Sequence, residues 1–334
     1  MLIMKDILTD TFGRKHNYLR ISLTERCNLR CTYCMPAEGI QLSPKEHIMT
    51  YEEIYTIAKK FVDLGVTKIR LTGGEPLVRK DVSQILEQLA LLPVQLTLTT
   101  NGIMVDRFID LFKKCKIKSL NVSLDSLKAE KNRKITRRSY FEKVYQNILL
   151  LIREGFTVKI NCVLMKGFND DEIIDFIKLT KEHPIQVRFI EFMPFDGNRW
   201  KMDQMVSLQD ILQRVTTHFD QKNCIKQQDA LNDTTKSYRI KGYQGTFAII
   251  SSVTNPFCDG CNRIRLTANG QIKNCLFSSK ESDILTPLRQ GHSITSIIEH
   301  AIQSKFKVRS GMDTIDKFKQ TDAHNNRSMI TIGG

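Results

Sequence analysis

Residues 18–36 read YLRISLTERCNLRCTYCMP, a β-like run that leads directly into Cys27, Cys31 and Cys34. The spacing C-x3-C-x2-C supplies three thiolates, whereas a closed structural zinc site takes four ligands. Three thiolates on a cubane iron–sulfur cluster leave one iron open to a small chelating molecule. The stretch therefore predicts a strand that delivers an open-sided cluster to its carboxyl end.

A second set of three cysteines lies far along the chain, where Cys258, Cys261 and Cys275 are spaced C-x2-C-x13-C. C-x2-C pairs are common in zinc knuckles, and His292 or His300 could supply a fourth ligand, so a zinc ribbon stays open for this set. The first triad favours the other interpretation. Two open-sided clusters would then serve one cofactor and one substrate.

The composition favours a reducing compartment. No apolar run in the 334 residues is long enough to span a bilayer, and the opening residues, MLIMKDILTD, lack the basic-then-apolar order of a secretory signal. Disulfides are not expected, and unpaired thiols are free to bind metal. We expect a cytoplasmic enzyme in which the remaining cysteines are ordinary thiols, namely Cys115, Cys162 and Cys224.

The formal net charge of +14 calls for an anionic partner. Nucleic acid, an acidic membrane surface and a phosphorylated metabolite all meet that description, and charge alone does not separate them. The basic stretch 128–138 (KAEKNRKITRR) lacks the interleaved aromatic residues on which single-stranded nucleic acid stacks. Such stretches are more often solvated surfaces, so we expect no nucleic-acid or membrane partner.

Short β-like runs alternate with helix-like stretches over the first part of the chain. Amphipathic segments at 51–64, 82–91 and 140–154 separate the runs and argue against antiparallel hairpins. Repeated βα units of this kind predict a parallel sheet. The predicted strands are 18–24, 68–72, 95–101, 119–125, 157–163 and 186–193.

Each predicted strand has one apolar and one polar face, because residues two apart share a face. A closed eight-stranded barrel would be filled by branched apolar side chains, and these strands do not provide them on both faces. We therefore expect an open (β/α)6 partial TIM barrel with a polar lumen for an anionic ligand. The lumen positions are Arg20, Ser22, Thr24, Lys68, Arg70, Thr72, Thr97, Thr99, Asn101, Asn121, Ser123, Asp125, Lys159 and Asn161.

Two features sit at strand ends. Thr72-Gly73-Gly74-Glu75-Pro76 follows the second strand, where parallel barrels place their ligands and where glycines let a backbone approach a ligand closely. In the sixth strand, Arg188 and Met193 have opposite parity, so both can face the lumen only if a bulge or a strand end intervenes.

The cysteine loop and the GGEP turn resemble those of radical S-adenosylmethionine (SAM) enzymes, in which the open iron binds the amino and carboxylate groups of SAM. Nearly the whole chain is similar to the GTP 3′,8-cyclase family of molybdenum-cofactor biosynthesis. Departures are small, with Glu25 in place of the usual Asp and Leu23 in place of a common Val. The matching stretches are Gly13-Arg14, 19–22, 24–36, 68–81, 98–102, 121–127, 188–194, 257–266, Cys275 and 332–334.

The resemblance implies two [4Fe–4S] clusters and SAM as cofactors. The implied cluster ligands are Cys27, Cys31 and Cys34 for the SAM-cleaving cluster, and Cys258, Cys261 and Cys275 for a cluster whose open iron takes the guanine ring. The implied SAM contacts are Tyr33, Gly74, Ser123 and Met193. The implied GTP contacts are Arg20, Arg70, Thr99, Lys159, Arg263 and Arg265, with Lys68 and Arg188 as further triphosphate candidates.

By the same resemblance, residues 1–193 form the radical SAM barrel. Residues 194–334 form a C-terminal domain that carries the second cluster, closes the barrel mouth and ends in a Gly333-Gly334 tail reaching the active site. The implied reaction is radical cyclisation of GTP to (8S)-3′,8-cyclo-7,8-dihydroguanosine 5′-triphosphate, the first step of the pathway. The implied partners are cyclic pyranopterin monophosphate synthase as the next enzyme and an electron donor of the flavodoxin or ferredoxin type.

Two rival classes remain open. A different two-cluster radical SAM enzyme that modifies peptides would carry more C-terminal cysteines than the three found here. A basic zinc protein that binds nucleic acid would need a fourth ligand at each cysteine site and has no use for a polar lumen. The sequence leaves the oligomeric state open, a homodimer included, and the polar stretch Gln221–Lys236 receives no function.

Overall fold

The computed structural model describes residues 6–314, 316–317 and 326–333. The strands in these residues form one 12-stranded sheet in the order β12-β11-β10-β1-β2-β3-β4-β5-β6-β9-β8-β7, so the sheet is open and its two ends do not pair. The strands are β1 (Tyr18–Ser22), β2 (Lys68–Thr72), β3 (Gln95–Thr100), β4 (Ser119–Ser123), β5 (Thr157–Leu164), β6 (Gln186–Glu191), β7 (Cys224–Lys226), β8 (Lys236–Ile240), β9 (Thr246–Ile250), β10 (Arg263–Leu266), β11 (Gln271–Lys273) and β12 (Ser282–Asp283).

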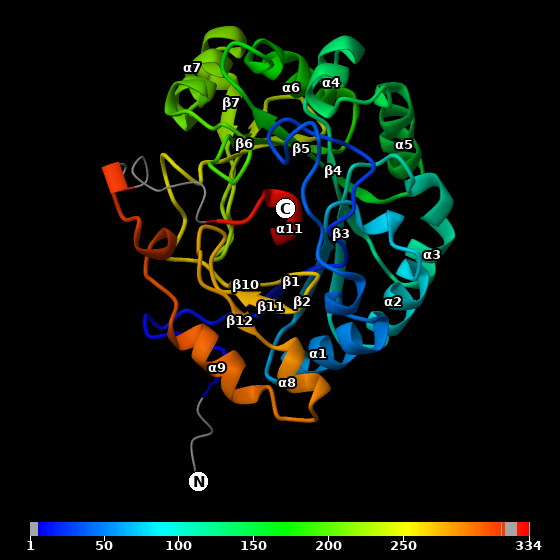
Figure 1. Cartoon of the computed structure of the whole chain (residues 1–334). Helices are drawn as coiled ribbons and strands as arrows, with labels where there is room; N and C mark the ends of the chain where they lie inside the picture. The colour runs from blue at the N-terminus through cyan, green and yellow to red at the C-terminus, as the bar shows by residue number, and fades with distance from the viewer. Residues whose placement is uncertain (1–5, 315, 318–325, 334) are drawn as a thin grey trace.

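The first six strands lie side by side in chain order and are all parallel, which confirms the predicted open α/β barrel. Helices cover the outside of the curved sheet, while the C-terminal helix α11 lies inside the curve (Figure 1). The helices are α1 (Tyr51–Asp63), α2 (Val82–Leu89), α3 (Ile109–Lys114), α4 (Ala129–Thr136), α5 (Phe141–Arg153), α6 (Ile173–Glu182), α7 (Leu208–Phe219), α8 (Leu285–Arg289), α9 (Thr295–Gln303) and α11 (Met329–Ile332).

The C-terminal part of the chain extends this sheet at both edges. β10 is parallel to β1, and β9 is parallel to β6, so each outer strand of the predicted barrel gains a partner from beyond residue 193. The remaining strands, β11, β12, β8 and β7, add antiparallel pairs outside them. The division at residue 193 thus falls between two parts of one sheet, and it stays a prediction.

Local signals explain where α1 begins and which face it buries. The Thr50 hydroxyl accepts a hydrogen bond from the Glu53 amide at 3.2 Å, and the Glu53 carboxylate accepts one from the Thr50 amide at 2.7 Å. This reciprocal cap supplies partners for amides that a helix start leaves unpaired. Helical spacing then puts Ile54, Ile57 and Phe61 on one buried face.

Strand β5 shows how the fold separates core from lumen. Val158, Ile160 and Leu164 are buried in the hydrophobic core, whereas Lys159 and Asn161, one residue out of phase, line the inner cavity. Because strand side chains alternate between faces, one apolar and one polar face follow from the sequence itself. The alternation predicted from sequence is therefore confirmed at this strand.

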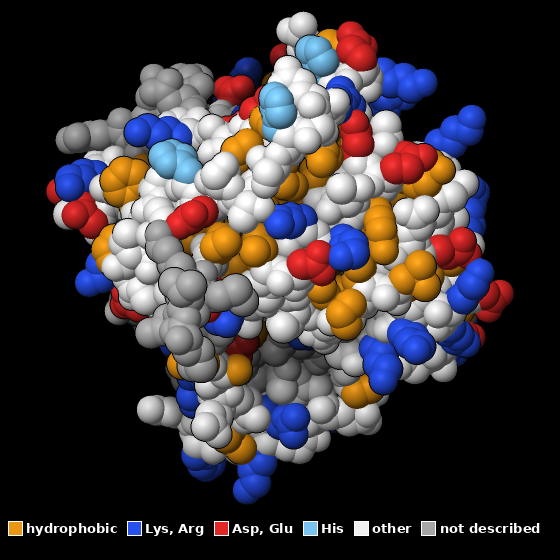
Figure 2. Space-filling model, turned by 90° about the horizontal axis from the view of Figure 1, so that it is seen from below, with side chains coloured by type: hydrophobic (Ala, Val, Ile, Leu, Met, Phe, Trp, Pro, Cys, Tyr) orange, Lys and Arg blue, Asp and Glu red, His pale blue; other side chains and the backbone are white. Residues whose placement is uncertain are grey.

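Part of the positive charge is used in surface ion pairs. Lys59 contacts Asp63 at 2.8 Å, and Lys113 contacts Glu154 at 2.6 Å. On the face in Figure 2, Lys and Arg side chains lie among Asp and Glu rather than in a single stripe. Within the described part of the chain, no helix is both long and apolar enough to cross a membrane.

Candidate active site

A cavity of about 650 Å³ lies on the inner side of the sheet, and all of the cluster, SAM and GTP residues that the resemblance implies line it. The cavity brings together two cysteine triads, and more than 200 residues of the chain separate one triad from the other. The lining residues among those predictions are Cys27, Cys31, Cys34, Cys258, Cys261, Cys275, Tyr33, Gly74, Ser123, Met193, Arg20, Lys68, Arg70, Thr99, Lys159, Arg188, Arg263 and Arg265.

The first triad lies on the loop after β1. Burial raises the pKa of the Cys27 thiol to about 11, and burial followed by the charge of Cys34 raises that of Cys31. The thiols therefore lie close enough to disfavour one another's ionisation, and only a cationic group between them would hold them as thiolates. An iron–sulfur cluster is such a group, so the donor set fits it.

The second triad has a different electrostatic setting. Burial alone would raise the pKa of Cys261, but the nearby charges of Arg263 and Lys305 lower it to about 6. A guanidinium nitrogen of Arg263 lies 3.7 Å from the Cys261 sulfur. Cys261 is thus prepared as a thiolate ligand near neutral pH.

A zinc ribbon would need a fourth ligand for the second triad. Both histidines considered for that role, His292 and His300, are exposed, and neither lines the cavity. Among the described residues, no three His, Cys, Asp or Glu side chains are grouped so that they could hold a single metal ion.

Strand register arranges the basic residues in rows across the cavity wall. Arg20 on β1 is level with Arg70 on β2 and with Arg265 on β10. Two residues earlier along the strands, on the same face, Tyr18 is level with Lys68 and with Arg263. Like charges on neighbouring strands repel, so an anion bound between the basic side chains would stabilise these rows.

The basic residues outnumber the acidic ones around the cavity. Burial, together with the nearby charges of Arg188 and Arg70, lowers the pKa of Lys159 to about 8. The buried Nε of Arg20 has no hydrogen-bond partner. Among the described lining residues the acidic ones are Asp125, Glu191 and Asp233, and the basic ones are Arg20, Lys68, Arg70, Lys159, Arg188, Arg263, Arg265, Lys305 and Arg309.

The GGEP turn uses its glycines for close approach. The Gly74 amide donates to the Thr24 carbonyl at 2.7 Å, and a Cβ at Gly74 would lie 2.4 Å from the Arg26 carbonyl oxygen. No larger residue fits there without moving the cysteine loop. The Glu75 carboxylate instead accepts hydrogen bonds from Thr100 Oγ1 and the Asn101 amide, at 2.8 and 2.6 Å, and therefore braces the turn.

The C-terminal segment enters the same cavity. Arg265 donates to the Gly333 carbonyl at 2.9 Å, and Ser328 Oγ donates to the Cys34 carbonyl at 2.7 Å. A Cβ at Gly333 would lie 2.5 Å from Thr72 Oγ1. The second glycine of the predicted tail, Gly334, lies outside the described residues.

The parity question at β6 is settled by a strand end. β6 stops at Glu191, so Met193 belongs to the following loop, and both Arg188 and Met193 line the cavity. Some lumen positions predicted from alternation are not part of the lining. Thr97 donates to the Ile69 carbonyl at 3.1 Å, while Ser22 and Thr72 lie beneath Gly333.

Sequence reasoning missed one segment of the site. Residues 230–234, within the polar stretch that received no function, line the cavity between β7 and β8. A Cβ at Gly260 would lie 2.8 Å from the Leu231 carbonyl oxygen, so the segment contacts the second cysteine loop. No periodicity or motif marks it. Asn101, Asn121, Asp125 and Asn161 also line the cavity, as alternation predicted, without a role assigned to them.

Two family models match the chain, the radical SAM superfamily over residues 21–180 and Molybdenum Cofactor Synthesis C over residues 185–310. A protein of Arabidopsis thaliana named "GTP 3',8-cyclase, mitochondrial" is 46% identical over 337 residues, which cover 99% of this chain and 84% of that protein. The chain belongs to the GTP 3′,8-cyclase family. Membership in this radical SAM family implies a [4Fe–4S] cluster and SAM.

Other relatives in the family differ in length. The "GTP 3',8-cyclase" of Peptoclostridium acidaminophilum is 42% identical over 99% of both chains. The human "Molybdenum cofactor biosynthesis protein 1" is 45% identical, covering 97% of this chain but 51% of the human protein. The chain therefore spans about half the length of several relatives that it matches.

Solved structures share the fold at low sequence identity. The crystal structure of Streptococcus suis SuiB bound to S-adenosylmethionine matches with a TM-score of 0.66 at 15% identity, covering 94% of this chain and 77% of that one. At this identity the likeness shows the radical SAM fold alone.

Proposed function

We propose that this protein is a GTP 3′,8-cyclase, a lyase that uses SAM as its radical source and catalyses the first step of molybdenum-cofactor biosynthesis. One observation supports the proposal above all others. Two cysteine triads and a set of basic side chains that outnumber the acidic ones line the same cavity, so a polyanionic substrate can lie between two clusters. The names of the relatives agree with this reading.

Cys27, Cys31 and Cys34 would hold the SAM-binding [4Fe–4S] cluster, with the backbone at Gly74 and the side chains of Tyr33, Ser123 and Met193 around the cofactor. A reduced cluster with SAM bound there would supply a 5′-deoxyadenosyl radical, the species that hydrogen abstraction at ribose C3′ of GTP needs. Cys258, Cys261 and Cys275 would hold a second cluster. We assign it to residues 194–334, which we propose as the C-terminal domain.

The chain's own residues fix the substrate. Arginine forks from β1, β2 and β10 offer pairs of donors that match phosphate oxygens, and Lys159 adds a point charge from β5. GTP would be held at its triphosphate and at its guanine ring, which places ribose C3′ next to guanine C8. The C3′ radical can then bond to C8, and one electron and one proton complete the cyclised nucleotide. A flavodoxin- or ferredoxin-type protein would deliver that electron. The proposed contacts are Arg20, Lys68, Arg70, Thr99, Lys159, Arg188, Arg263 and Arg265.

We place the enzyme in the cytoplasm, although one relative is named as mitochondrial. Its product would pass to cyclic pyranopterin monophosphate synthase. The chemistry of the cavity depends neither on the compartment nor on the enzyme that takes the product.

The activity is tested by anaerobic assay of the reconstituted protein with GTP, SAM and dithionite. We expect cyclised nucleotide and 5′-deoxyadenosine in equal amounts. Replacing Cys27, Cys31 and Cys34 by Ala should abolish both products, whereas Cys115→Ala, which removes a buried thiol that does not line the cavity, should leave them unchanged. Release of 5′-deoxyadenosine with a peptide and not with GTP would favour the peptide-modifying alternative.

A further inference from the structure

A direct hydrogen bond joins the first cysteine loop to the barrel wall. The hydroxyl of Tyr33, between Cys31 and Cys34, donates to Oδ2 of Asp125 at 2.7 Å. Asp125 follows β4, is 3% exposed and lines the cavity. Of the carboxylates lining the cavity, it is the one hydrogen-bonded to this loop in the described structure.

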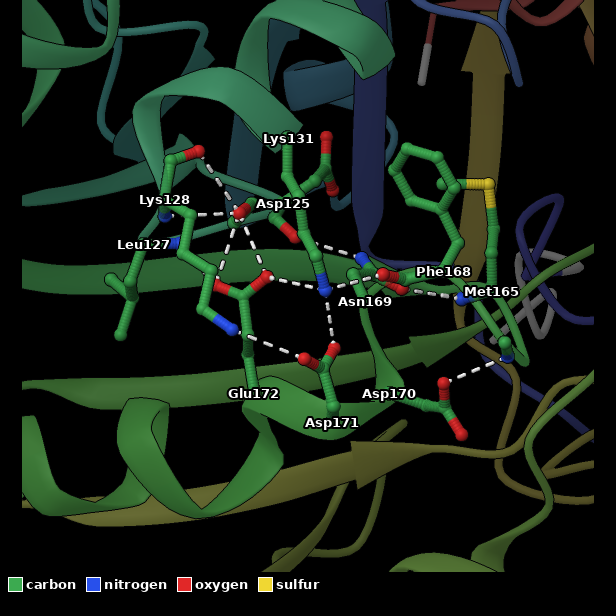
Figure 3. Close-up of polar contacts among 12 residues, drawn as sticks. Asp125, Leu127, Lys128, Lys131, Met165, Phe168, Asn169, Asp170, Asp171 and Glu172 are labelled. Atoms are coloured by element: carbon green, nitrogen blue, oxygen red, sulfur yellow. Dashed lines mark hydrogen bonds and ion pairs between the residues drawn. The ribbon is translucent and has the colours of Figure 1, made fainter.

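The Asp125 carboxylate is itself held from the next strand. Its Oδ1 accepts from the Val163 amide at 2.8 Å, and its main-chain carbonyl accepts from Asn169 Nδ2 at 2.7 Å. Asn169 also donates to the Val163 carbonyl at 2.9 Å. Its side-chain oxygen accepts from the Met165 amide at 2.8 Å (Figure 3). One side chain from the β5–α6 loop therefore locks both backbones that position the carboxylate.

The turn after Asp125 is clamped as well. The Glu172 carboxylate accepts from Ser126 Oγ at 2.9 Å and from the Leu127 amide at 2.7 Å. Outside this pair, Asp171 contacts Lys131 at 2.6 Å and Lys128 at 3.1 Å (Figure 3). These contacts leave the carboxylate little freedom, which is the property a support for a functional side chain requires.

Burying a carboxylate at the position of Asp125 costs free energy. Desolvation disfavours its charge, and the three neighbouring thiolates of a cluster site would repel it. An apolar side chain of similar size would fill the space without either cost. What only the carboxylate provides is a fixed acceptor for the Tyr33 hydroxyl.

We propose that Asp125 is a positioning residue for SAM, which acts by fixing the Tyr33 hydroxyl and thereby the ring and the cysteine loop that face the cofactor. The proposal rests on the proposed function, because it assigns Tyr33 to the SAM site. Without the Asp125 acceptor, the Tyr33 ring loses the hydrogen bond that sets its orientation.

The test compares Tyr33→Phe, Asp125→Ala and Asp125→Asn in the full, anaerobically reconstituted chain. Each variant is first matched to the natural protein in iron content, and SAM affinity and 5′-deoxyadenosine release are then measured. Tyr33→Phe and Asp125→Ala should each weaken SAM binding about tenfold, the effect of losing one hydrogen bond to a charged group. The double variant should bind no worse than either single variant, because both remove the same contact.

Asp125→Asn is the conservative rescue. Its amide oxygen can accept from the Val163 amide while its NH2 group donates to the Tyr33 oxygen, so most of the SAM affinity should return. A merely structural or electrostatic need for a buried carboxylate would not be met by this replacement. If Asp125→Ala fails to fold, Tyr33→Phe and Asp125→Asn still decide the question.

Glu191→Ala is the matched control. Glu191 is another buried carboxylate at the end of a strand lining this cavity, and it accepts from the Val253 and Thr254 amides at 2.8 and 3.0 Å, away from the first cysteine loop. Equal loss of SAM affinity in Glu191→Ala, or normal affinity in Tyr33→Phe, would overturn the proposal. Failure of the natural protein to bind SAM at all would overturn the proposed function instead.

Discussion

Arg20 is the lining residue whose surroundings point most directly to an anionic ligand. Its buried Nε has no partner, burial lowers its pKa to about 10, and Arg70 and Arg265 stand level with it on neighbouring strands. A phosphate group is the ligand whose geometry and charge answer all three features at once. The residue-scale predictions concern this set of cations.

Arg70→Ala or Lys159→Ala should weaken GTP binding while leaving SAM cleavage without GTP largely intact. Each change removes a charge-assisted contact worth roughly 1.5–3 kcal/mol, about ten- to a hundredfold in affinity. Equilibrium binding of GTP measures the loss, and Lys59→Ala, which removes an exposed ion-paired lysine, is the control. Normal GTP affinity combined with lost RNA affinity would assign the basic residues to another partner.

GTP affinity should fall as the pH rises from 7 to 9. Because burial lowers the pKa of Lys159 to about 8, this lysine is charged below pH 8 and loses its proton above it in the free protein. Triphosphate favours the charged form, so GTP binding above pH 8 takes up a proton. Calorimetry in two buffers of different ionisation enthalpy detects that uptake. In Lys159→Arg the uptake should largely disappear, and an unchanged value would assign it to another group.

At the scale of elements, the six barrel strands were predicted from sequence and none of the later strands was. β1 to β6 show clear alternation, because one face packs on helices and the other lines a polar cavity. β7, β11 and β12 span two or three residues, too few for a periodic pattern, and they form only because an existing sheet edge offers partners. The segment 230–234 was missed for the same reason: its place depends on β8 and on the second cysteine loop.

The C-terminal segment is the element on which activity should depend most steeply. Gly333→Ala would place a Cβ 2.5 Å from Thr72 Oγ1, at a backbone φ of 83° that side chains rarely adopt. Cyclised product should fall by about a hundredfold or more, since small displacements of reacting groups have that effect, while iron content stays unchanged.

The control for this change is Gly291→Ala. Gly291 has a similar φ of 75° but no atom within 4 Å of the added Cβ, so it carries the backbone strain without the clash. Undiminished product in Gly333→Ala would make the segment an ordinary terminus. Loss of iron would make its role structural.

The whole molecule should hold about eight iron and eight sulfide per chain when both proposed [4Fe–4S] sites are filled, and negligible zinc. Metal analysis of anaerobically purified protein measures this directly. Replacing Cys258, Cys261 and Cys275 by Ala should halve the iron and leave the SAM-binding cluster. A fully loaded protein with four iron, or with one tightly held zinc, would contradict the two-cluster arrangement.

How much of the candidate site could be predicted also depends on scale. The cysteine spacing and strand alternation identified side chains that now share one cavity, because both patterns are local. That Arg265 stands level with Arg20, or that Gly333 covers Thr72, follows from long-range pairing that no local pattern encodes. The resemblance to a known family supplied residues such as Arg263, and it connected Cys275, which the cysteine spacing had already identified, to the barrel.

The pairing of β1 with β10 also delays completion of the sheet while the chain is being synthesised. Most of the sequence separates the two strands, so at ordinary rates of translation β1 waits roughly tens of seconds for its outer neighbour. During that time both margins of the six-strand sheet, at β1 and at β6, display unpaired backbone groups that can capture another chain. A ribosome that stalls before residue 246 would therefore leave a six-strand sheet with both edges unpaired and prone to aggregation. Protection by chaperones matters most in that interval.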